Sequence, residues 1–205
     1  MPPFTVLHVC LGNICRSPMA ERLLTRAVAD RLSALIPSGA DVAEFVHSHS
    51  AGTGGWHAGE EMNPPAARQV RSRGGAVDDF GARKLRSEHI DAADLVLTAT
   101  ADQQEYVVAL RPDAADRTFV LGEFARLLPA VDASTPSPAA EPPDPDAVYA
   151  RGVALVAAAA AVRRGSSPLP GDDLDDPWGR GDQCFSRVAD EIEEAVRPLA
   201  AVLLP

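Results

Sequence analysis

The stretch VCLGNICRSPMAE, residues 9–21, contains the change of pattern that decides how the start of this chain folds. The run TVLHVC, residues 5–10, is short, apolar and β-branched, as expected for a buried strand that ends near Gly12. Ser17 followed by Pro18 is typical of a helix N-cap and first turn, and apolar residues then recur at helical spacing. The stretch therefore predicts a strand–loop–helix unit whose loop carries two cysteines and an arginine.

The same alternation continues along the chain. Strand patterns recur at residues 42–50, 95–98 and 118–121, with helical patterns between them. Strands that alternate with helices form a parallel sheet with helices on both faces, so we expect an α/β fold with a doubly wound, four-stranded parallel sheet. In such sheets ligands bind at the carboxyl ends of the strands, beside a helix N-terminus. The loop at residues 11–17 lies at such a position.

The composition limits the class of partner. The chain has 205 residues, of which 46% are hydrophobic, and its formal net charge is −10 at pH 7. This charge argues against nucleic acid or an anionic membrane surface as the main partner. The run LVAAAAAV, residues 155–162, is too short for a membrane span, and the first residues do not form a signal peptide. We therefore expect a cytoplasmic protein, with no nucleic-acid or membrane partner.

The loop chemistry points to Cys10 as a nucleophile. Backbone amides of residues 11–17 would form a nest at the helix N-terminus, which binds a tetrahedral oxyanion such as phosphate and favours a thiolate. Arg16 can grip two phosphoryl oxygens with its planar fork. Gly12 permits close approach, Asn13 tolerates a left-handed backbone, and Ser17 can hydrogen-bond the thiolate. The loop residues expected to bind the substrate are Leu11, Gly12, Asn13, Ile14, Cys15 and Ser17.

A thiolate that attacks phosphorus needs a general acid for the leaving oxygen. The segment DDLDDPW, residues 172–178, offers four aspartates, and crowding of carboxylates favours keeping one of them protonated. Asp176 is preferred because Pro177 stiffens the turn beside it. Trp56 and Trp178 are either core aromatics or walls of a slot for a flat phosphorylated ring, and their loop positions favour the slot.

Several other residues allow two interpretations. Cys15 is either a small buried hydrophobe or a partner that traps oxidised Cys10 as a disulfide, and we favour the redox role. Cys184 fits core packing. His47 and His49 share a strand face but lack a nearby third ligand, so we expect polar strand residues and no metal site. We expect His57 to be structural.

The motif CLGNICRSPxAE resembles the phosphate loop of low-molecular-weight protein tyrosine phosphatases, whose pattern is C-x5-R-S directly after the first strand. The segments HSAGT (49–53), ADLVLT (93–98) and DDPW (175–178) resemble further parts of that family. The resemblance implies a four-stranded parallel sheet, a cysteinyl-phosphate intermediate, and neither metal nor cofactor. The roles it assigns are Cys10 as nucleophile, Arg16 as phosphate clamp, Asn13 and Ser17 as loop supports, and Asp176 as acid and then base.

The expected function is hydrolysis of phosphotyrosine in a protein substrate. An arsenate reductase on the same fold would need further resolving cysteines near the loop, and Cys184 is poorly placed for that role. An inactive phosphotyrosine-binding module would not need Asp176. A protein arginine phosphatase is a further alternative, but that branch of the family has threonine where this chain has Ile14. In addition, Gly179 stands where the family often has a second tyrosine.

Residues 129–171 are longer than the connection usual in the family. We expect a single phosphatase domain, 1–205, with an insertion at about 129–171 that precedes the acid loop. Within it, the proline-rich residues 129–145 predict an extended connector, and the alanine-rich residues 147–164 predict a helix. We expect this helix to pack near the final helix and beside the acid loop, where it would wall one side of the phosphate pocket.

Overall fold

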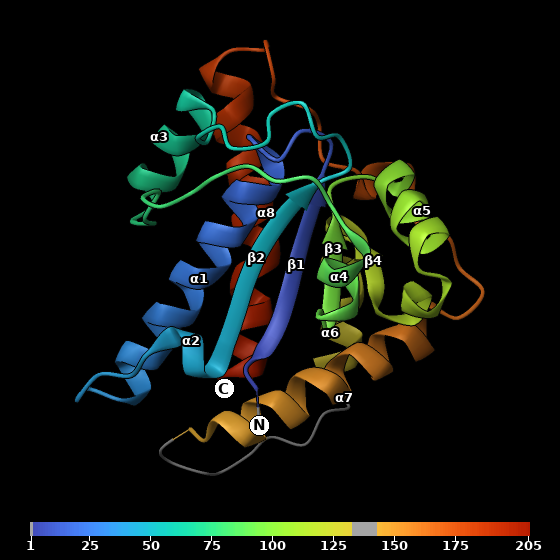
Figure 1. The fold of residues 1–205 in the computed structure, drawn as a ribbon. Coiled ribbons are helices and arrows are strands. Elements are labelled where there is room, and N and C mark those ends of the chain that lie inside the picture. The colour runs from blue at the N-terminus through green and yellow to red at the C-terminus, as the bar shows by residue number, and fades with distance from the viewer. Residues whose placement is uncertain (1, 133–142) are drawn as a thin grey trace.

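The computed structural model describes residues 2–132 and 143–205. Within these residues, the centre of the molecule is a parallel sheet of four strands in the order β2-β1-β3-β4 (Figure 1). The strands are β1 (Phe4–Cys10), β2 (Val46–Gly52), β3 (Leu95–Thr98) and β4 (Thr118–Val120). The predicted α/β fold with a four-stranded parallel sheet is confirmed.

Helices cover both faces of the sheet, as expected (Figure 1). Val6 packs toward the first group of helices, whereas Leu7 and Val9 pack toward the second, because successive strand side chains point to opposite faces. The first group contains α1 (Arg16–Leu35), α3 (Pro64–Ser72), α6 (Leu121–Asp132) and α8 (Asp182–Leu203). The second group contains α4 (Ser87–Asp91), α5 (Ala101–Leu110) and the 3-10 helix η1 (Pro112–Arg117).

Two boundaries differ from the sequence-based expectation. The strand expected at residues 42–50 begins only at Val46, because α2 (Val42–Phe45) precedes it and Asp41 caps that helix by accepting the Ala43 N–H at 3.0 Å. Helix α1 begins at Arg16, with Cys15 at the N-cap position. Ser17 is therefore not the cap, and its hydroxyl lies 3.0 Å from Cys10 Sγ instead.

Two helices continue through an internal proline. Helix α6 continues through Pro129 to Asp132, so the connector expected from residue 129 begins later. The expected extended course of residues 133–142 lies outside the described residues. Helix α8 likewise runs past Pro198 to Leu203. In both cases the last turn carries buried apolar side chains, and their packing offsets the lost backbone bond: Leu128 and Val131 in α6, and Leu199, Val202 and Leu203 in α8.

The helix expected at residues 147–164 is confirmed as α7 (Pro145–Arg163), and it contacts α8 as expected. Its expected position beside the phosphate pocket is wrong. It lies across the edge of the sheet where the strands begin (Figure 1). Gly152 packs against Phe4 at the start of β1, and the Tyr149 hydroxyl donates to Asp94 just before β3. Arg163 donates to the Thr118 carbonyl at the start of β4 at 2.6 Å. These contacts place α7 at the end of the sheet opposite the loop that carries Cys10.

Helix α7 is also the one helix among the described residues whose length and mean hydropathy of 1.3 would suit a membrane span. In this structure part of its apolar surface packs on the domain. The side chains of Val148, Leu155 and Val156 are buried against it. The exposed remainder consists of Val153, Val162 and small alanines. After α7 the chain returns through the 3-10 helix η2 (Pro170–Asp172) to the acid loop.

Candidate active site

The loop between β1 and α1 wraps around the Cys10 sulfur. Cys10 is buried at the end of β1, and its Sγ accepts the Asn13 backbone N–H at 3.3 Å. The Asn13 side-chain amide donates to Ser17 Oγ at 2.9 Å, so the Ser17 hydroxyl proton is left for Cys10 Sγ at 3.0 Å or the Ala51 carbonyl at 3.4 Å. The Asn13 N–H therefore points at the sulfur, and the Ser17 hydroxyl lies within hydrogen-bond distance of it.

Asn13 fixes the shape of this loop. Its backbone is left-handed, with φ of 57°, as the sequence predicts for an asparagine at this position. Its side chain also donates to Ser50 Oγ at 2.8 Å and accepts the Arg83 N–H at 2.9 Å. The Ser50 hydroxyl in turn donates to Glu21 Oε2 at 2.6 Å. The loop is thus tied to both β2 and α1.

Sequence reasoning missed Glu21 and Ser50. Glu21 is buried, and this burial raises the pKa of its carboxyl, while the Ser50 hydrogen bond and the nearby Arg22 act in the opposite direction. The available signal was a glutamate in the second turn of a helix that begins at a functional loop. That signal alone does not separate a solvated glutamate from a buried one.

Arg16 is the first residue of α1, directly after the loop, and it is buried. Its Nη1 donates to the Leu174 carbonyl at 3.2 Å, and its Nη2 donates to Asp176 Oδ2 at 2.8 Å. Within the described part of the chain, Arg16 Nε is buried and has no hydrogen-bond partner. This edge of the guanidinium remains available for an oxyanion, which agrees with the predicted role of a phosphate clamp.

The acid loop, residues 172–178, is anchored along its length. Arg126 forms an ion pair with buried Asp172 at 2.7 Å, Asp173 Oδ1 accepts the Ala101 N–H at 2.8 Å, and the Leu174 N–H donates to the Ala99 carbonyl at 2.8 Å. Gly122 is required behind the loop, because a Cβ there would lie 2.4 Å from the Asp172 carbonyl oxygen.

We expected the four aspartates to crowd one another and so keep one of them protonated. This expectation is wrong, because three of them bind groups on other elements. Asp172 and Asp173 bind other elements, and Asp175 pairs with Arg187 of α8, whose hydrogen bond lowers the pKa of the Asp175 carboxyl. Among the four aspartates, Asp176 is the one that accepts a hydrogen bond from Arg16, and its Oδ1 accepts the Trp178 N–H at 3.1 Å. The side chain of Asp176 is 47% exposed, so it lies at the mouth of the site.

A cavity of about 240 Å³ lies above the Cys10 sulfur. Trp56 and Trp178 flank its opening, with 63% and 65% of their surfaces exposed, so they are not core aromatics. The Trp56 ring lies on Gly54, where any Cβ would overlap it. Asn13 and Ser17 lie behind the cavity as supports. The residues that line the cavity are Cys10, Leu11, Gly12, Ile14, Cys15, Arg16, Trp56, His57, Asp176 and Trp178.

Of the other residues that allowed two interpretations, Cys15 and His57 line the cavity and Cys184 does not. Cys15 is buried at the cavity wall, and burial together with nearby Cys10 raises the pKa of its thiol to about 12. Cys184 is half-buried in α8 and does not line this cavity in the described structure. His57, expected to be structural, lines the cavity, a position that its sequence context did not indicate.

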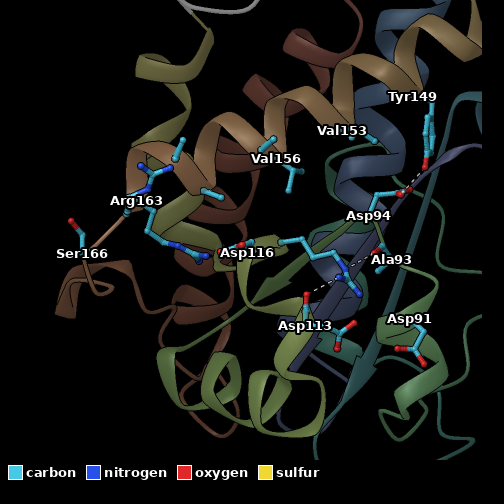
Figure 2. Close-up of a pocket in the computed structure, with 16 residues that line it drawn as sticks. Asp91, Ala93, Asp94, Asp113, Asp116, Tyr149, Val153, Val156, Arg163 and Ser166 are labelled. Atoms are coloured by element: carbon cyan, nitrogen blue, oxygen red, sulfur yellow. Dashed lines mark hydrogen bonds between the residues drawn. The ribbon is translucent and has the colours of Figure 1, made fainter.

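A larger cavity, about 910 Å³, lies at the opposite edge of the sheet, between α7 and η1 (Figure 2). Two of the three arginines that line it in the described structure bind backbone carbonyls: Arg117 donates to Ala93 and Asp113, and Arg163 donates to Thr118 and Ala115. No cysteine is among the described residues that line it. The arrangement of nucleophile, clamp and acid therefore identifies the smaller cavity as the candidate active site.

The solved structures that resemble this chain cover nearly all of it. The arginine phosphatase YwlE from Geobacillus stearothermophilus is 26% identical with a TM-score of 0.62, over 97% of this chain and 92% of that one. YfkJ from Bacillus subtilis gives a TM-score of 0.66 at 22% identity, over 98% of this chain and 94% of that one. The second likeness supports the fold.

Sequence relatives cover less of the chain. A low molecular weight protein-tyrosine-phosphatase from Streptomyces coelicolor is 33% identical over 142 residues, 69% of this chain and 77% of that protein. Low molecular weight protein-tyrosine phosphatase A from Mycobacterium tuberculosis is 34% identical over 113 residues, 55% of this chain and 63% of that protein. The model of the family described as low molecular weight phosphotyrosine protein phosphatase matches residues 5–142. This chain therefore belongs to the low molecular weight phosphotyrosine protein phosphatase family.

Proposed function

We propose that this chain hydrolyses phosphotyrosine in proteins through a cysteinyl-phosphate intermediate. In the first step the Cys10 thiolate attacks phosphorus, the bond from phosphorus to the tyrosine oxygen breaks, and Asp176 gives its proton to that oxygen. In the second step Asp176 takes a proton from water, which attacks phosphorus and releases phosphate and the Cys10 thiolate. Each proton given up in the first step is regained in the second.

The observation that carries this proposal is the hydrogen bond from Arg16 to Asp176 at the cavity that contains Cys10. It brings a nucleophile, an oxyanion clamp and an acid from the two ends of the chain to one opening. Arg16 Nε and the backbone amides of the loop supply donors for the phosphoryl oxygens, whose charge grows in the transition state. Ser17, whose oxygen already accepts a bond from Asn13, stabilises the Cys10 thiolate as the leaving group of the second step.

The opening also fits an aromatic leaving group. Trp56 and Trp178 line it with largely exposed indole rings, and Leu11 adds an exposed apolar side chain. A flat ring that enters between them reaches Cys10 with its phosphate first. These contacts support the assignment of Leu11, Trp56 and Trp178 to substrate binding, with Gly12, Ile14 and Cys15 as further wall residues.

A second candidate is the hydrolysis of phosphoarginine, because the Geobacillus relative is named as an arginine phosphatase. Against it, Ile14 presents an apolar side chain to the cavity and is buried there, so it offers no hydrogen bond to a guanidinium. An arsenate reductase would need further resolving thiols near the site besides Cys15, and Cys184 lies elsewhere, in α8. A passive binding module would gain nothing from Asp176 at the opening.

The deciding assay compares phosphotyrosine and phosphoarginine peptides without added metal. We expect hydrolysis of the phosphotyrosine peptide and at least tenfold slower turnover of the phosphoarginine peptide. Cys10→Ser should abolish turnover and retain phosphate binding, because Arg16 and the loop amides remain. Turnover by Cys10→Ser would show that Cys10 is not the nucleophile. Faster hydrolysis of the phosphoarginine peptide would make phosphoarginine hydrolysis the favoured function.

We also propose that residues 1–205 act as one phosphatase domain, with α7 as an inserted brace. Its contacts with Phe4, Asp94 and Thr118 tie the starts of three strands together. The chain then returns to the acid loop through Asp172, which Arg126 holds against α6.

A further inference from the structure

His57 and Glu60 form a pair at the rim of the candidate active site. The His57 Nδ1–H donates to Glu60 Oε2 at 2.8 Å, and 24% of the His57 side chain is exposed. This bond turns one edge of the imidazole toward Glu60 and leaves Nε2 on the other edge. A Cβ at Gly12 would lie 3.1 Å from His57 Cδ2 and 3.8 Å from Nε2. The free nitrogen therefore belongs to the edge that lies against the phosphate loop.

The backbone holds this pair in place before any substrate arrives. The Glu60 N–H donates to the His57 carbonyl at 2.9 Å, which closes a tight turn. Ala82 donates its N–H to the Glu60 carbonyl at 2.8 Å and accepts the Gly59 N–H at 2.7 Å. Both residues are thus fixed relative to the sheet, so a contact made by His57 needs little further ordering of the chain.

Charge gives His57 a function at this position. Among the described residues that line the cavity, Arg16 and His57 are the two that can carry a positive charge. In a doubly protonated imidazole both ring nitrogens donate, so Nδ1 can bind Glu60 while Nε2 binds an anion. In a chain with net charge −10, a second cation at the opening offsets the repulsion that an anionic substrate meets.

We propose that His57, oriented by Glu60, is a substrate-binding residue that donates a hydrogen bond from Nε2 to an anionic oxygen of the phosphorylated substrate. The inference rests on the proposed phosphatase function and deepens it. Two groups carry such an oxygen: the phosphoryl group itself, and the carboxylate of an acidic residue beside the phosphotyrosine. Glu60 acts through His57 and is a positioning residue.

The test measures binding to Cys10→Ser, in which turnover is abolished. The probes are inorganic phosphate and two phosphotyrosine peptides that differ only by glutamate or glutamine next to the phosphotyrosine, each titrated by calorimetry. We expect His57→Phe to weaken binding about fivefold for every probe that carries the contacted oxygen, as for a charged hydrogen bond at a partly exposed site. His57→Gln, which keeps a neutral donor, should lose less. Glu60→Gln should weaken binding about twofold.

The matched control is Glu61→Gln, which removes the neighbouring exposed carboxylate and leaves the bond from His57 to Glu60 intact. In the active protein, the His57 and Glu60 variants should raise KM with kcat within twofold of wild type, a split that a general loss of structure does not give. Thermal unfolding of each variant checks that it is folded.

Each outcome decides the matter. Weaker binding of inorganic phosphate assigns the phosphoryl oxygen, and weaker binding of the glutamate peptide alone assigns the carboxylate. Unchanged affinity for all three probes in both His57 variants overturns the inference. So does a loss of affinity in Glu61→Gln equal to that in the His57 variants. An equal loss of affinity for the two peptides, with unchanged affinity for phosphate, also overturns it. Failure of the wild type to hydrolyse phosphotyrosine would defeat the proposed function, whereas the binding measurements would still decide the role of His57.

Discussion

The Arg16 guanidinium donates a hydrogen bond from Nη2 to Asp176 Oδ2 at 2.8 Å, although the two residues lie 160 positions apart in the chain. The guanidinium is buried and the carboxylate is about half exposed, so the pair spans the depth of the site. An incoming phosphoryl group competes with Asp176 for the Arg16 N–H groups. We expect this exchange to free Asp176 for the leaving oxygen at the moment when the clamp closes on phosphate.

Replacing Asp176 by asparagine keeps the size of the side chain and removes the proton. We expect Asp176→Asn to lower kcat on phosphotyrosine by roughly 10²–10⁴, the range for loss of acid–base catalysis. The loss should be smaller on nitrophenyl phosphate, whose leaving oxygen needs less help from an acid. Steady-state kinetics on the two substrates measure the difference.

The neighbouring variant Asp175→Asn is the control for Asp176→Asn. Asp175 pairs with Arg187 and Arg180 on the outer side of the acid loop. Its removal should leave the ratio of the two rates near that of wild type. Equal losses on both substrates in Asp176→Asn would show that Asp176 is not the acid.

We predict that Cys15 protects Cys10 from irreversible oxidation. Burial raises the pKa of the Cys15 thiol to about 12, so Cys15 stays protonated while the Cys10 sulfur faces donors from Asn13 and Ser17. We expect peroxide to convert Cys10 to a sulfenic acid with release of water. The Cys15 sulfur then displaces a second water molecule to form a disulfide, which a thiol reductant reverses.

Mass spectrometry and recovery of activity test this protection. Wild type should regain most of its activity after reduction, whereas Cys15→Ser should accumulate sulfinic acid on Cys10 and recover poorly. Cys184→Ser is the control, because Cys184 lies in α8 away from the cavity lining. Full recovery of Cys15→Ser would remove Cys15 from this role.

Local signals in the sequence were enough for the sheet, the phosphate loop and most of the site. The left-handed backbone of Asn13 and the position of Arg16 beside Cys10 agree with the prediction, because both depend on geometry within one short loop. Ser17 was wrongly predicted to be the helix N-cap as well, because serine before proline is typical of an N-cap whether or not its hydroxyl faces a sulfur. The partners Arg126 and Asp172 lie on segments 46 positions apart, and no local pattern joins them.

The position of α7 shows the same limit. Alanine content predicts that residues 147–164 form a helix, but the face on which a helix packs depends on the shape of what it meets. Phe4 and Gly152 fit together at the start of β1, and neither residue signals the other in sequence. His57 was missed for the same reason: its bond to Glu60 is local, but its contact with Gly12 arises only when β1 and β2 pair.

Glu21 should make stability depend on pH. Burial raises the pKa of its carboxyl above the value in the unfolded chain, so the folded state holds this proton more tightly. The contribution of protonated Glu21 to stability is present below the unfolded pKa and is lost as pH rises through the folded pKa. Glu21→Gln, which keeps an oxygen for the Ser50 hydroxyl and cannot ionise, should therefore be more stable than wild type at pH 8.

Denaturant unfolding at pH 4 and pH 8 measures this difference. The advantage of Glu21→Gln should shrink or vanish at pH 4, where the wild-type carboxyl is protonated. Glu105→Gln, on the exposed side of α5, reports the effect of removing one surface charge. An advantage that grows at pH 4 would contradict the assignment.

The packing of α7 gives a prediction whose sign is decisive. Glycine inside a helix is less favourable than alanine by about 1 kcal/mol, so Gly152→Ala would stabilise an α7 that made no contact at this point. A Cβ at Gly152 would instead lie 2.4 Å from Phe4 Cδ2 and 2.7 Å from Cγ, within a fully buried ring. We expect Gly152→Ala to destabilise the protein by about 1–3 kcal/mol, the usual cost of overpacking.

Because α7 lies at the opposite edge of the sheet from Cys10, kcat and KM of the folded variant should match wild type. Shortening the ring side chain in the double variant Phe4→Leu with Gly152→Ala should recover part of the loss, and a gain in stability from Gly152→Ala alone would show that α7 does not pack on β1.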